Sequence, residues 1–416
     1  MNAPFGSLPK PIAAEPDILV IAGEHSGDQQ GARLIKKILL LRPNLKIAAF
    51  GGPELEKAGA QLVYNLVDHS VIGIWEVLKN YGTFKKIFNQ TIDWITLHRP
   101  KIVIFIDYPG FNLRVAQRLF DMKISKQAGG TVKLFYYIGP QIWAWKSKRR
   151  FSMGKMLDNL AVIFPFEVHC YSDTQLPTRF VGHPFVEEDY TLPVQYDANG
   201  VILLLPGSRL QPVSRIFPAM VDAWTLYAKD RPNERAAVLY PSELIRVELE
   251  RILATRPEAK QRLTLFPIGE QPRTGATSTI EDPNASKRMT YRLKSIKAKA
   301  VLTSSGTMSL CCALAGIPGA IAYRAHPITY WLGRRLVKIP HLGIANILLH
   351  PRCVYPEFIQ NEATPQKLAD QLRLVVDIPS QRKESIHVVE QLRAALTASA
   401  EHSAPIWIID ILEHRK

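Results

Sequence analysis

Residues 21–35, IAGEHSGDQQGARLI, contain the turn that decides the fold. An apolar strand at 18–22 leads into this turn, and the spacing of Leu34, Ile35 and Ile38 predicts a helix after it. Between strand and helix lie two glycines, one hydroxyl group and two carboxylates, carried by Gly23, Glu24, Ser26, Gly27 and Asp28. The stretch is therefore a strand–turn–helix unit with an unusually acidic turn.

The turn combines features that suit two different ligands. Main-chain N–H groups at the start of a helix attract phosphate, whereas Glu24 and Asp28 accept hydrogen bonds from sugar hydroxyls or amides. Gly23 and Gly27 allow a close approach to the backbone. The mixture favours an aminosugar over a pyrophosphate, and the G-x-G-x-x-G spacing of a dinucleotide-binding fold is missing. For Asp28, a helix N-cap is the alternative interpretation.

The same alternation of apolar strands and helical patterns continues along the chain. Strands are predicted at 18–22, 47–50, 102–106, 132–138, 160–164, 178–181, 236–240, 263–267, 300–303 and 319–323, and a further strand opens VILLLPGSR at 201–209. This alternation predicts an α/β protein with parallel sheets covered by helices on both faces. Ligands of such folds bind at the carboxyl ends of the strands.

A chain of 416 residues is too long for one ordinary core and predicts two domains. The acidic, proline-containing stretch EEDYTLPVQYDANG, which ends in the turn-forming pair Asn-Gly, marks the boundary. We expect two doubly wound, Rossmann-like domains with a cleft between them. Their expected bounds are a tail at 1–16, a first domain at 17–186, a linker at 187–200, a second domain at 201–390 and a helical segment at 391–416 that packs back. Residues 268–288 are polar and predict a surface loop.

The composition narrows the classes of partner. With 47% apolar and 21% charged residues the chain is typical of a globular protein, but its net charge of +15 favours a polyanionic neighbour. The basic residues form no arginine-rich arm and no RNA-binding signature, so a membrane surface or phosphorylated substrates are expected before nucleic acid. The four cysteines form no C-x-x-C pair, which indicates a reducing cytosol.

Two segments could be mistaken for membrane-directed sequence. The first 16 residues hold three prolines and no apolar run, so they are not expected to be a signal peptide. Residues 300–323 carry no charge, yet Ser-Ser-Gly-Thr and Gly-Ile-Pro-Gly interrupt them. They are predicted to form a buried strand, a loop, a short helix and a second buried strand.

Ten short motifs follow one another in a characteristic order. They are AGEHSGD (22–28), GGPELEKAG (51–59), VIGIWEVL (71–78), FIDYPGFN (105–112), GPQIWAW (139–145), FPFE (164–167), VGHP (181–184), LPGSR (205–209), SSGT (304–307) and PEFIQ (356–360). Together they resemble lipid-A-disaccharide synthase from about residue 17 to the C-terminus. The resemblance implies a GT-B fold, which agrees with the two α/β domains predicted above.

The resemblance also implies an activity. It is the inverting transfer of 2,3-diacylglucosamine from its UDP derivative to 2,3-diacylglucosamine 1-phosphate, which releases UDP and forms the β-1,6 disaccharide of lipid A. The expected location is the cytoplasmic face of a Gram-negative inner membrane. No cofactor is expected, and the sequence contains no D-x-D motif or histidine cluster that would require a metal.

Asp107 is the expected catalytic base. It closes the apolar strand KIVIFI, precedes a Pro-Gly turn and matches the family's candidate base, so it could take the proton of the acceptor's 6-hydroxyl. The alternatives are a helix cap or an ion pair. The resemblance assigns substrate binding to Gly23, Glu24, Ser26, Gly27, Asp28, Glu76 and Asn112.

The nucleotide is expected in the second domain, at two turns that follow strands. In LPGSR, the Arg209 guanidinium can hold phosphate in a bidentate manner, and SSGT opens a helix whose N–H groups can receive the pyrophosphate. The expected nucleotide-binding residues are Gly207, Ser208, Arg209, Ser305, Gly306, Thr307 and, by resemblance alone, Asn346.

Membrane contact is expected from the stretch between Trp75 and Ile95. Its apolar residues recur at helical spacing beside lysines, and the expected contacts are Trp75, Leu78, Phe84, Phe88, Lys85 and Lys86. A core helix is the alternative. The basic residues after GPQIWAW could meet lipid phosphates or the 1-phosphate of the acceptor, or they could form a solvated helix face; they are Lys146, Lys148, Arg149, Arg150 and Lys155.

Three positions depart from the family pattern. Pro212 and Cys311 stand where the family usually has glutamates, and Ala345 replaces a proline. The glutamate at the second position commonly holds the ribose hydroxyls, so Cys311 predicts weaker UDP binding. Two alternatives to the synthase activity therefore stay open: a non-catalytic relative with lost ribose contacts, and a GT-B enzyme that uses another UDP-sugar.

Overall fold

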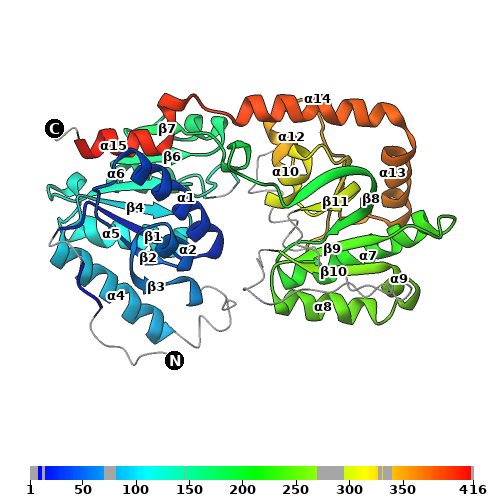
Figure 1. The fold of residues 1–416 in the computed structure, drawn as a ribbon, viewed down its shortest axis with the longest axis horizontal. Coiled ribbons are helices and arrows are strands. Elements are labelled where there is room, and N and C mark those ends of the chain that lie inside the picture. Colours follow the sequence, from blue (N-terminus) through cyan, green and yellow to red (C-terminus); the bar gives the residue numbers. More distant parts are fainter. Residues whose placement is uncertain are drawn as a thin grey trace. The chain divides into compact units, whose positions relative to one another are not determined.

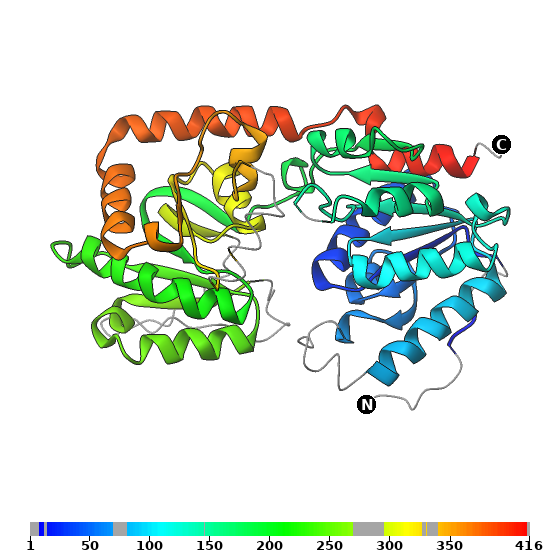
Figure 2. The same cartoon turned by 180° about the vertical axis from the view of Figure 1, so that it is seen from behind.

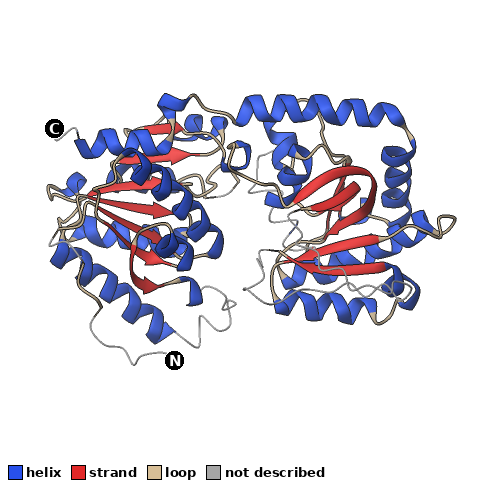
Figure 3. Ribbon diagram, viewed as in Figure 1, coloured by secondary structure: helices blue, strands red, loops and turns tan. Residues whose placement is uncertain are grey.

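The computed structural model describes residues 8–11, 15–69, 81–144, 146–268, 295–326, 330 and 340–413. The chain forms two compact units. Unit 1 comprises Met1–Val186 and Leu396–Lys416, and unit 2 comprises Glu187–Ala395. In each unit one sheet lies between layers of helices (Figure 3).

Unit 1 contains a seven-stranded parallel sheet in the order β3-β2-β1-β4-β5-β6-β7. Its strands are β1 (Ile18–Ala22), β2 (Ile47–Gly51), β3 (Gln61–Asn65), β4 (Ile102–Ile106), β5 (Lys133–Tyr137), β6 (Asn159–Val162) and β7 (Thr178–Phe180). Its helices are α1 (His25–Leu41), α2 (Pro53–Lys57), α4 (Tyr81–His98), α5 (Pro109–Asp121), α6 (Arg149–Met156) and α15 (Ala404–Glu413). Short 3₁₀-helices lie at Val67–His69, Lys126–Ala128, Pro165–Tyr171, Pro184–Val186 and Ala400–His402.

The strand order of unit 1 reverses between β1 and β4. These two central strands are neighbours, paired from Ile18↔Ile102 to Ala22↔Ile106, and all their residues are buried. Strands covered on both faces read as continuous apolar runs, which explains why ILVIA and IVIFI were recognisable in the sequence. The residues after both strands emerge side by side at such a switch point.

Two apolar layers enclose this sheet. Alternate residues of β1 and β4 pack with α4, α5 and α6 on one face and with α1, α2 and α15 on the other (Figures 1 and 2). Helix α15 returns to unit 1 after the whole of unit 2 and buries Trp407, whose ring meets Phe135 edge-on at 5.1 Å between centroids.

Unit 2 contains a six-stranded parallel sheet in the order β10-β9-β8-β11-β12-β13. Its strands are β8 (Val194–Leu205), β9 (Ala236–Tyr240), β10 (Leu263–Pro267), β11 (Ile296–Thr303), β12 (Gly319–Tyr323) and β13 (Glu357–Ile359). Its helices are α7 (Leu210–Ala228), α8 (Glu243–Leu253), α9 (Pro257–Arg262), α10 (Thr307–Leu314), α12 (Ile344–Leu348), α13 (Pro365–Asp377) and α14 (Pro379–Leu396), with a 3₁₀ turn at Gln360–Glu362.

The stretch expected as a linker at 187–200 is partly a strand. Strand β8 starts at Val194, which pairs with Ile296, and the pairing of β8 with β11 shifts register twice, between Lys297 and Ala298 and between Ala298 and Ala300. The Asn-Gly pair looked like a turn, but a Cβ at Gly200 would lie 2.7 Å from the Ala298 nitrogen, so glycine is needed for the close approach of β11. The expected boundary at 390 also differs, because α14 continues to Leu396.

The uncharged segment 300–323 folds as expected into the end of β11, a turn, α10 and β12. Among the described residues, none of the helices combines the length and the apolar character needed to cross a bilayer. The polar stretch expected to form a surface loop lies outside the described residues from 269 onward.

Candidate active site

The carboxyl ends of β1 and β4 bring two carboxylates together in unit 1. Glu24 follows β1 and Asp107 follows β4, two strands paired through Ala22 and Ile106. Partial burial, followed by the negative charge of Glu24, raises the pKa of Asp107 to about 6. A hydrogen bond from the main chain at Tyr108 opposes this shift. Asp107 is thus a stronger base than an ordinary aspartate and is still mostly ionised at pH 7.

The exposed part of this site is the N-terminus of α1. Glu24 is the N-cap residue, without a side-chain cap bond to the helix, and the next two residues, His25 and Ser26, are exposed as well. His25 and Gln29 form a hydrogen bond of 3.0 Å one turn apart. The turn therefore presents a carboxylate, an imidazole and a hydroxyl group beside Asp107, groups that suit a sugar.

Asp28 does not belong to the exposed site. Its carboxylate is fully buried and accepts hydrogen bonds from the main-chain nitrogens of Gly52 at 2.8 Å, Glu54 at 3.0 Å and Leu55 at 3.2 Å. The prediction that it binds the sugar is therefore wrong, because its oxygens cap the N-terminus of α2. The capping alternative holds, although for a different helix from its own.

Both glycines of the turn are buried, but only Gly23 is required by a close contact within the protein. A Cβ at Gly23 would lie 2.2 Å from the Tyr108 ring, so this ring occupies the space in which a ligand was expected. Gly27 is buried in the first turn of α1.

Asn112 is also buried rather than exposed to substrate. Its amide nitrogen donates to the main-chain oxygens of Asp107 at 2.8 Å and Ile106 at 3.2 Å. The prediction of a direct substrate contact is wrong for this side chain, which supports the turn that carries Asp107. Glu76 lies outside the described residues.

In unit 2, the two turns expected to hold the nucleotide lie side by side. Leu205 and Thr303 pair at the ends of β8 and β11, and the Ser304 N–H donates to the Leu205 oxygen at 2.7 Å. A Cβ at Gly207 would lie 3.0 Å from the Ser304 hydroxyl oxygen, so LPGSR and SSGT touch. The N-termini of α7 and α10 therefore reach the same edge of the sheet.

The side chains at this edge are accessible. Ser208 and Arg209 are exposed, and Arg209 is the N-cap residue of α7. Gly306 and Thr307 are exposed at the start of α10, with Ser305 half-buried beside them. Two helix N-termini, hydroxyl groups and a guanidinium form a suitable environment for a pyrophosphate.

Comparison with known proteins identifies the family. The family model described as lipid-A-disaccharide synthetase matches residues 18–272 and 283–408. The chain belongs to the lipid-A-disaccharide synthase family. The lipid-A-disaccharide synthase of Geobacter metallireducens is 33% identical over 393 residues, which cover 92% of each chain. Lipid-A-disaccharide synthase 1 of Legionella pneumophila strain Paris is 32% identical over 391 residues, which cover 92% of this chain and 94% of the relative.

Solved structures with little sequence identity share the fold. A putative UDP-N-acetylglucosamine 2-epimerase from Listeria monocytogenes aligns with a TM-score of 0.56 at 13% identity, over 96% of both chains. A glycosyltransferase of kitacinnamycin aligns with a TM-score of 0.55 at 12% identity, over 96% of this chain and 99% of that one. The predictions of a GT-B fold and of a glycosyltransferase of lipid A biosynthesis are confirmed.

Asn346, which the resemblance to lipid-A-disaccharide synthase assigned to the nucleotide, is occupied within the protein. It is fully buried, its amide nitrogen donates to the Tyr355 oxygen and to Glu357, each at 2.8 Å, and its amide oxygen accepts from the Tyr355 nitrogen at 2.9 Å. The prediction of a nucleotide contact is therefore wrong, because Asn346 holds together the segment between α12 and β13.

Cys311 does not face the exposed end of α10. Its side chain is 1% exposed, and burial raises the pKa of the thiol to about 12. Position 311, where the family usually has a glutamate, thus faces the interior of unit 2, and the expectation that Cys311 weakens UDP binding stays a prediction. Ala345 is buried as well, whereas Pro212 is half-buried in the first turn of α7.

The helix expected at the membrane is mainly a core helix. Ile92 and Ile95 of α4 are buried, and the Phe88 ring packs edge-on against Phe111 at 6.0 Å. The core alternative therefore holds for this part of the helix, including Phe88. Near its start, Phe84 is half-buried and the two lysines that follow it, Lys85 and Lys86, are exposed. Trp75 and Leu78 lie outside the described residues.

A buried acid supports the GPQIWAW motif. Glu167 accepts hydrogen bonds from Trp143 Nε1 and the Phe164 nitrogen, both at 3.1 Å. Burial raises the pKa of Glu167 to about 7.

Of the basic residues after the GPQIWAW motif, Arg150 forms a bidentate ion pair with Asp173 at 2.6 and 2.7 Å. Trp145 lies outside the described residues.

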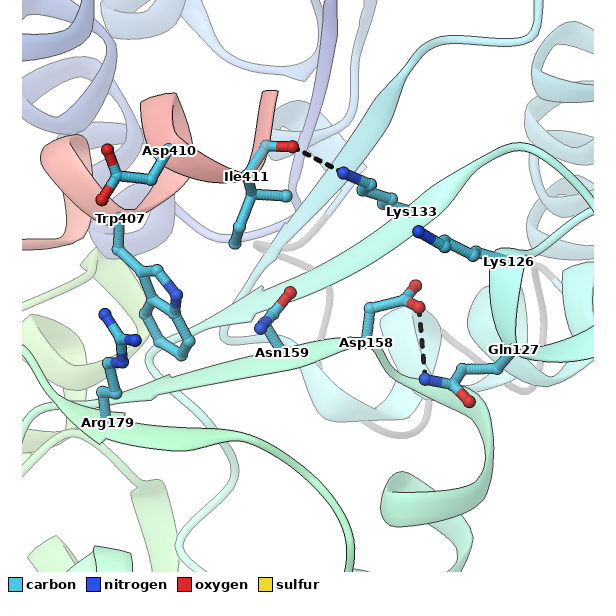
Figure 4. Close-up of a pocket in the computed structure, with 9 residues that line it drawn as sticks. All are labelled: Lys126, Gln127, Lys133, Asp158, Asn159, Arg179, Trp407, Asp410 and Ile411. Atoms are coloured by element: carbon cyan, nitrogen blue, oxygen red, sulfur yellow. Dashed lines mark hydrogen bonds between the residues drawn. The ribbon is translucent and has the colours of Figure 1, made fainter. Parts of the chain in front are cut away.

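A cavity of about 450 Å³ in unit 1 lies at the end of the sheet opposite Asp107. Its lining residues are Lys126, Gln127, Lys133, Asp158, Asn159, Arg179, Trp407, Asp410 and Ile411, drawn in Figure 4. Lys133 and Asn159 begin their strands, so the cavity lies at amino ends and Asp107 at carboxyl ends. Lys133 Nζ donates to the Ile411 oxygen at 2.5 Å, and the Arg179 guanidinium lies 4.6 Å from the Trp407 ring centroid. These contacts fasten α15 to the sheet.

Within the described ranges, no group of three or more histidine, cysteine and carboxylate side chains is arranged to hold a metal ion.

Tyr136 supports the candidate base but was not predicted from the sequence. Its hydroxyl donates to the Asp107 oxygen at 2.6 Å, and its place next to the end of β5 is the one signal that could have drawn attention to it.

Proposed function

We propose that the chain transfers 2,3-diacylglucosamine from UDP-2,3-diacylglucosamine to the 6-hydroxyl of 2,3-diacylglucosamine 1-phosphate, with inversion at the anomeric carbon. The observation that carries the proposal is the pairing of Asp107 with Glu24 at the β1/β4 switch point in a member of this family. A carboxylate whose pKa is about 6 matches the task of a general base near neutral pH.

Asp107 takes the proton from the 6-hydroxyl as the hydroxyl oxygen attacks the anomeric carbon. The bond from that carbon to the UDP oxygen breaks, and UDP leaves with the electron pair. Attack from the side opposite the leaving group converts an α-linked donor into a β-1,6 product. Glu24 has two roles in this proposal: its charge strengthens the base, and its oxygens accept hydrogen bonds from the sugar.

The nucleotide is assigned to unit 2. Arg209 and the hydroxyl groups of Ser208, Ser305 and Thr307 meet the pyrophosphate, whose charge the N-termini of α7 and α10 also stabilise. Gly207 and Gly306 shape the two turns, with φ angles of +113° and +155° that other residues rarely adopt. Stabilising the charge on UDP as it leaves favours the transfer itself.

We place the enzyme at the cytoplasmic face of an anionic inner membrane, as a peripheral protein. The net charge of +15 and the exposed Lys85 and Lys86 support electrostatic attraction to anionic lipids. Both proposed substrates carry acyl chains, so the active site has to receive them from a bilayer.

The test is incubation of the purified protein with both substrates, followed by detection of UDP and a disaccharide phosphate. Asp107→Ala should lower turnover about a hundredfold or more, the scale of a lost general base, while the fold is kept. UDP-N-acetylglucosamine serves as the unacylated donor control, and its preferential use would support a different UDP-sugar. Tight substrate binding without product would support a non-catalytic relative, the alternative raised by Pro212 and Cys311.

A further inference from the structure

The main chain at Asp107 has a rare conformation. Asp107 and Tyr108 are consecutive non-glycine residues in the left-handed region, with φ angles of +43° and +49°. Such residues persist only where the surrounding structure holds them, and they are concentrated at functional sites. The turn must therefore be held by specific contacts.

Two buried hydrogen-bond donors hold this turn through one acceptor, the main-chain oxygen of Asp107. The main-chain oxygen of Asp107 accepts a hydrogen bond of 2.6 Å from the Tyr136 hydroxyl and one of 2.8 Å from Asn112 Nδ2. Both side chains are fully buried, and no water can replace them as donors at this depth without rearrangement. The Asp107 N–H is used too, since it donates to the Tyr137 oxygen at 3.2 Å.

The geometry points to Tyr136 and Asn112 as positioning residues for the reaction. They hold the main chain of Asp107 in its left-handed conformation, which keeps the Asp107 carboxylate beside Glu24. If the main chain relaxed to an ordinary conformation, the carboxylate would point elsewhere. This inference rests on the proposed function, because it assigns a role to the turn only if Asp107 is the base. Neither side chain reaches the surface, so both act through Asp107 and not on the substrate.

A purely structural role would predict a different pattern of effects. If the tyrosine hydroxyl only stabilised unit 1, its loss would lower the melting temperature and the amount of folded enzyme, but the remaining folded enzyme would turn over normally. If it positions Asp107, the folded enzyme itself is slower, because displacement of a catalytic group by about 1 Å costs on the order of a hundredfold in rate.

The experiment compares Tyr136→Phe, Asp107→Ala and the double variant by steady-state kinetics on folded protein. We expect Tyr136→Phe to lower kcat by about 10- to 100-fold, with KM for both substrates within about twofold of the wild type. The acidic limb of its pH–rate profile should move to lower pH. Without the tyrosine hydroxyl the Asp107 carboxylate is less firmly held and more hydrated, and hydration lowers its pKa. The double variant should be no slower than Asp107→Ala alone, because the hydroxyl then has no base to position.

Tyr171→Phe is the matched control. Tyr171 is a second buried tyrosine of unit 1, whose hydroxyl bonds Met153 Sδ at 3.7 Å instead of Asp107, and its loss should leave kcat unchanged. Wild-type kcat in Tyr136→Phe, or an equal further loss in the Asp107→Ala background, would overturn the inference. Full activity in Asp107→Ala would instead overturn the proposed base, and these results are distinguishable.

Discussion

Asp107 and Glu24 follow neighbouring parallel strands, and the charge of Glu24 adds to burial in raising the pKa of Asp107 to about 6. Burial at the end of β4 together with a second acidic residue after the neighbouring strand thus turns an ordinary aspartate into a base suited to neutral pH. The same pair determines how activity should depend on pH.

We expect kcat/KM to fall as the pH drops below about 6, because protonated Asp107 cannot accept the hydroxyl proton. Glu24→Gln removes a neighbouring negative charge and should lower the pKa of Asp107, so the acidic limb should move to lower pH. A pH–rate profile of both proteins measures this, with Glu56→Gln on α2 as the control for loss of an exposed carboxylate. An unmoved limb in Glu24→Gln would show that burial alone sets the pKa.

Glu167 predicts a pH dependence of stability. Burial raises its pKa from an ordinary value of 4.5 to about 7 in the folded protein, so the folded state favours the protonated acid. The contribution of Glu167 to the unfolding free energy is therefore fully present below pH 4.5 and is lost as the pH rises through 7. Relative to the wild type, Glu167→Gln should gain on the order of 3 kcal/mol in unfolding free energy between pH 4.5 and pH 8. Denaturant unfolding of both proteins at these pH values tests it, and a constant difference would contradict the buried-acid assignment.

Arg209 provides a test of the nucleotide site. Arg209→Ala should weaken UDP binding by roughly 1.5–3 kcal/mol, the scale of a lost charged hydrogen bond, and calorimetry measures it directly. Arg246→Ala is the matched control, because Arg246 lies on α8 of the same unit and pairs with Glu243. Equal affinity in the two variants would place the pyrophosphate elsewhere.

Membrane association should depend on the exposed lysines of α4. Lys85→Ser combined with Lys86→Ser should weaken binding to anionic vesicles by about 2 kcal/mol, since each lysine near a charged surface contributes about 1 kcal/mol. The loss should shrink as salt is added. A variant with Lys36→Ser and Lys229→Ser removes the same charge elsewhere; if it binds as weakly, net charge and not α4 controls association.

The alternation of apolar runs was enough to predict the parallel sheets, and the end of KIVIFI was enough to predict where Asp107 emerges. Sequence could not tell which polar residues of a motif face outward. Asp28 and Asn112 turn inward because Gly52 and the Asp107 carbonyl, both supplied by other elements, offer them hydrogen bonds. A capping residue and a ligand-binding residue have the same chemistry, so only the tertiary contact separates them.

Strand periodicity likewise predicts burial but not hydrogen bonding. Tyr136 is one of several buried aromatic residues in KLFYY, and nothing in that run distinguishes the hydroxyl that reaches Asp107. The Asn-Gly pair before β8's apolar run was misread for a related reason: the close approach of β11 explains the glycine, and β11 is almost a hundred residues away in the chain.

Helix α15 has a consequence for synthesis on the ribosome. The face of unit 1 that Trp407 and Ile408 cover includes Phe135 and Val181, which are translated more than two hundred residues earlier. During that interval unit 2 can emerge and fold, while the face of the nascent first unit that α15 later covers stays exposed. We therefore expect a stage of synthesis in which unit 2 is complete while unit 1 still exposes apolar surface, the kind of surface through which incomplete chains aggregate.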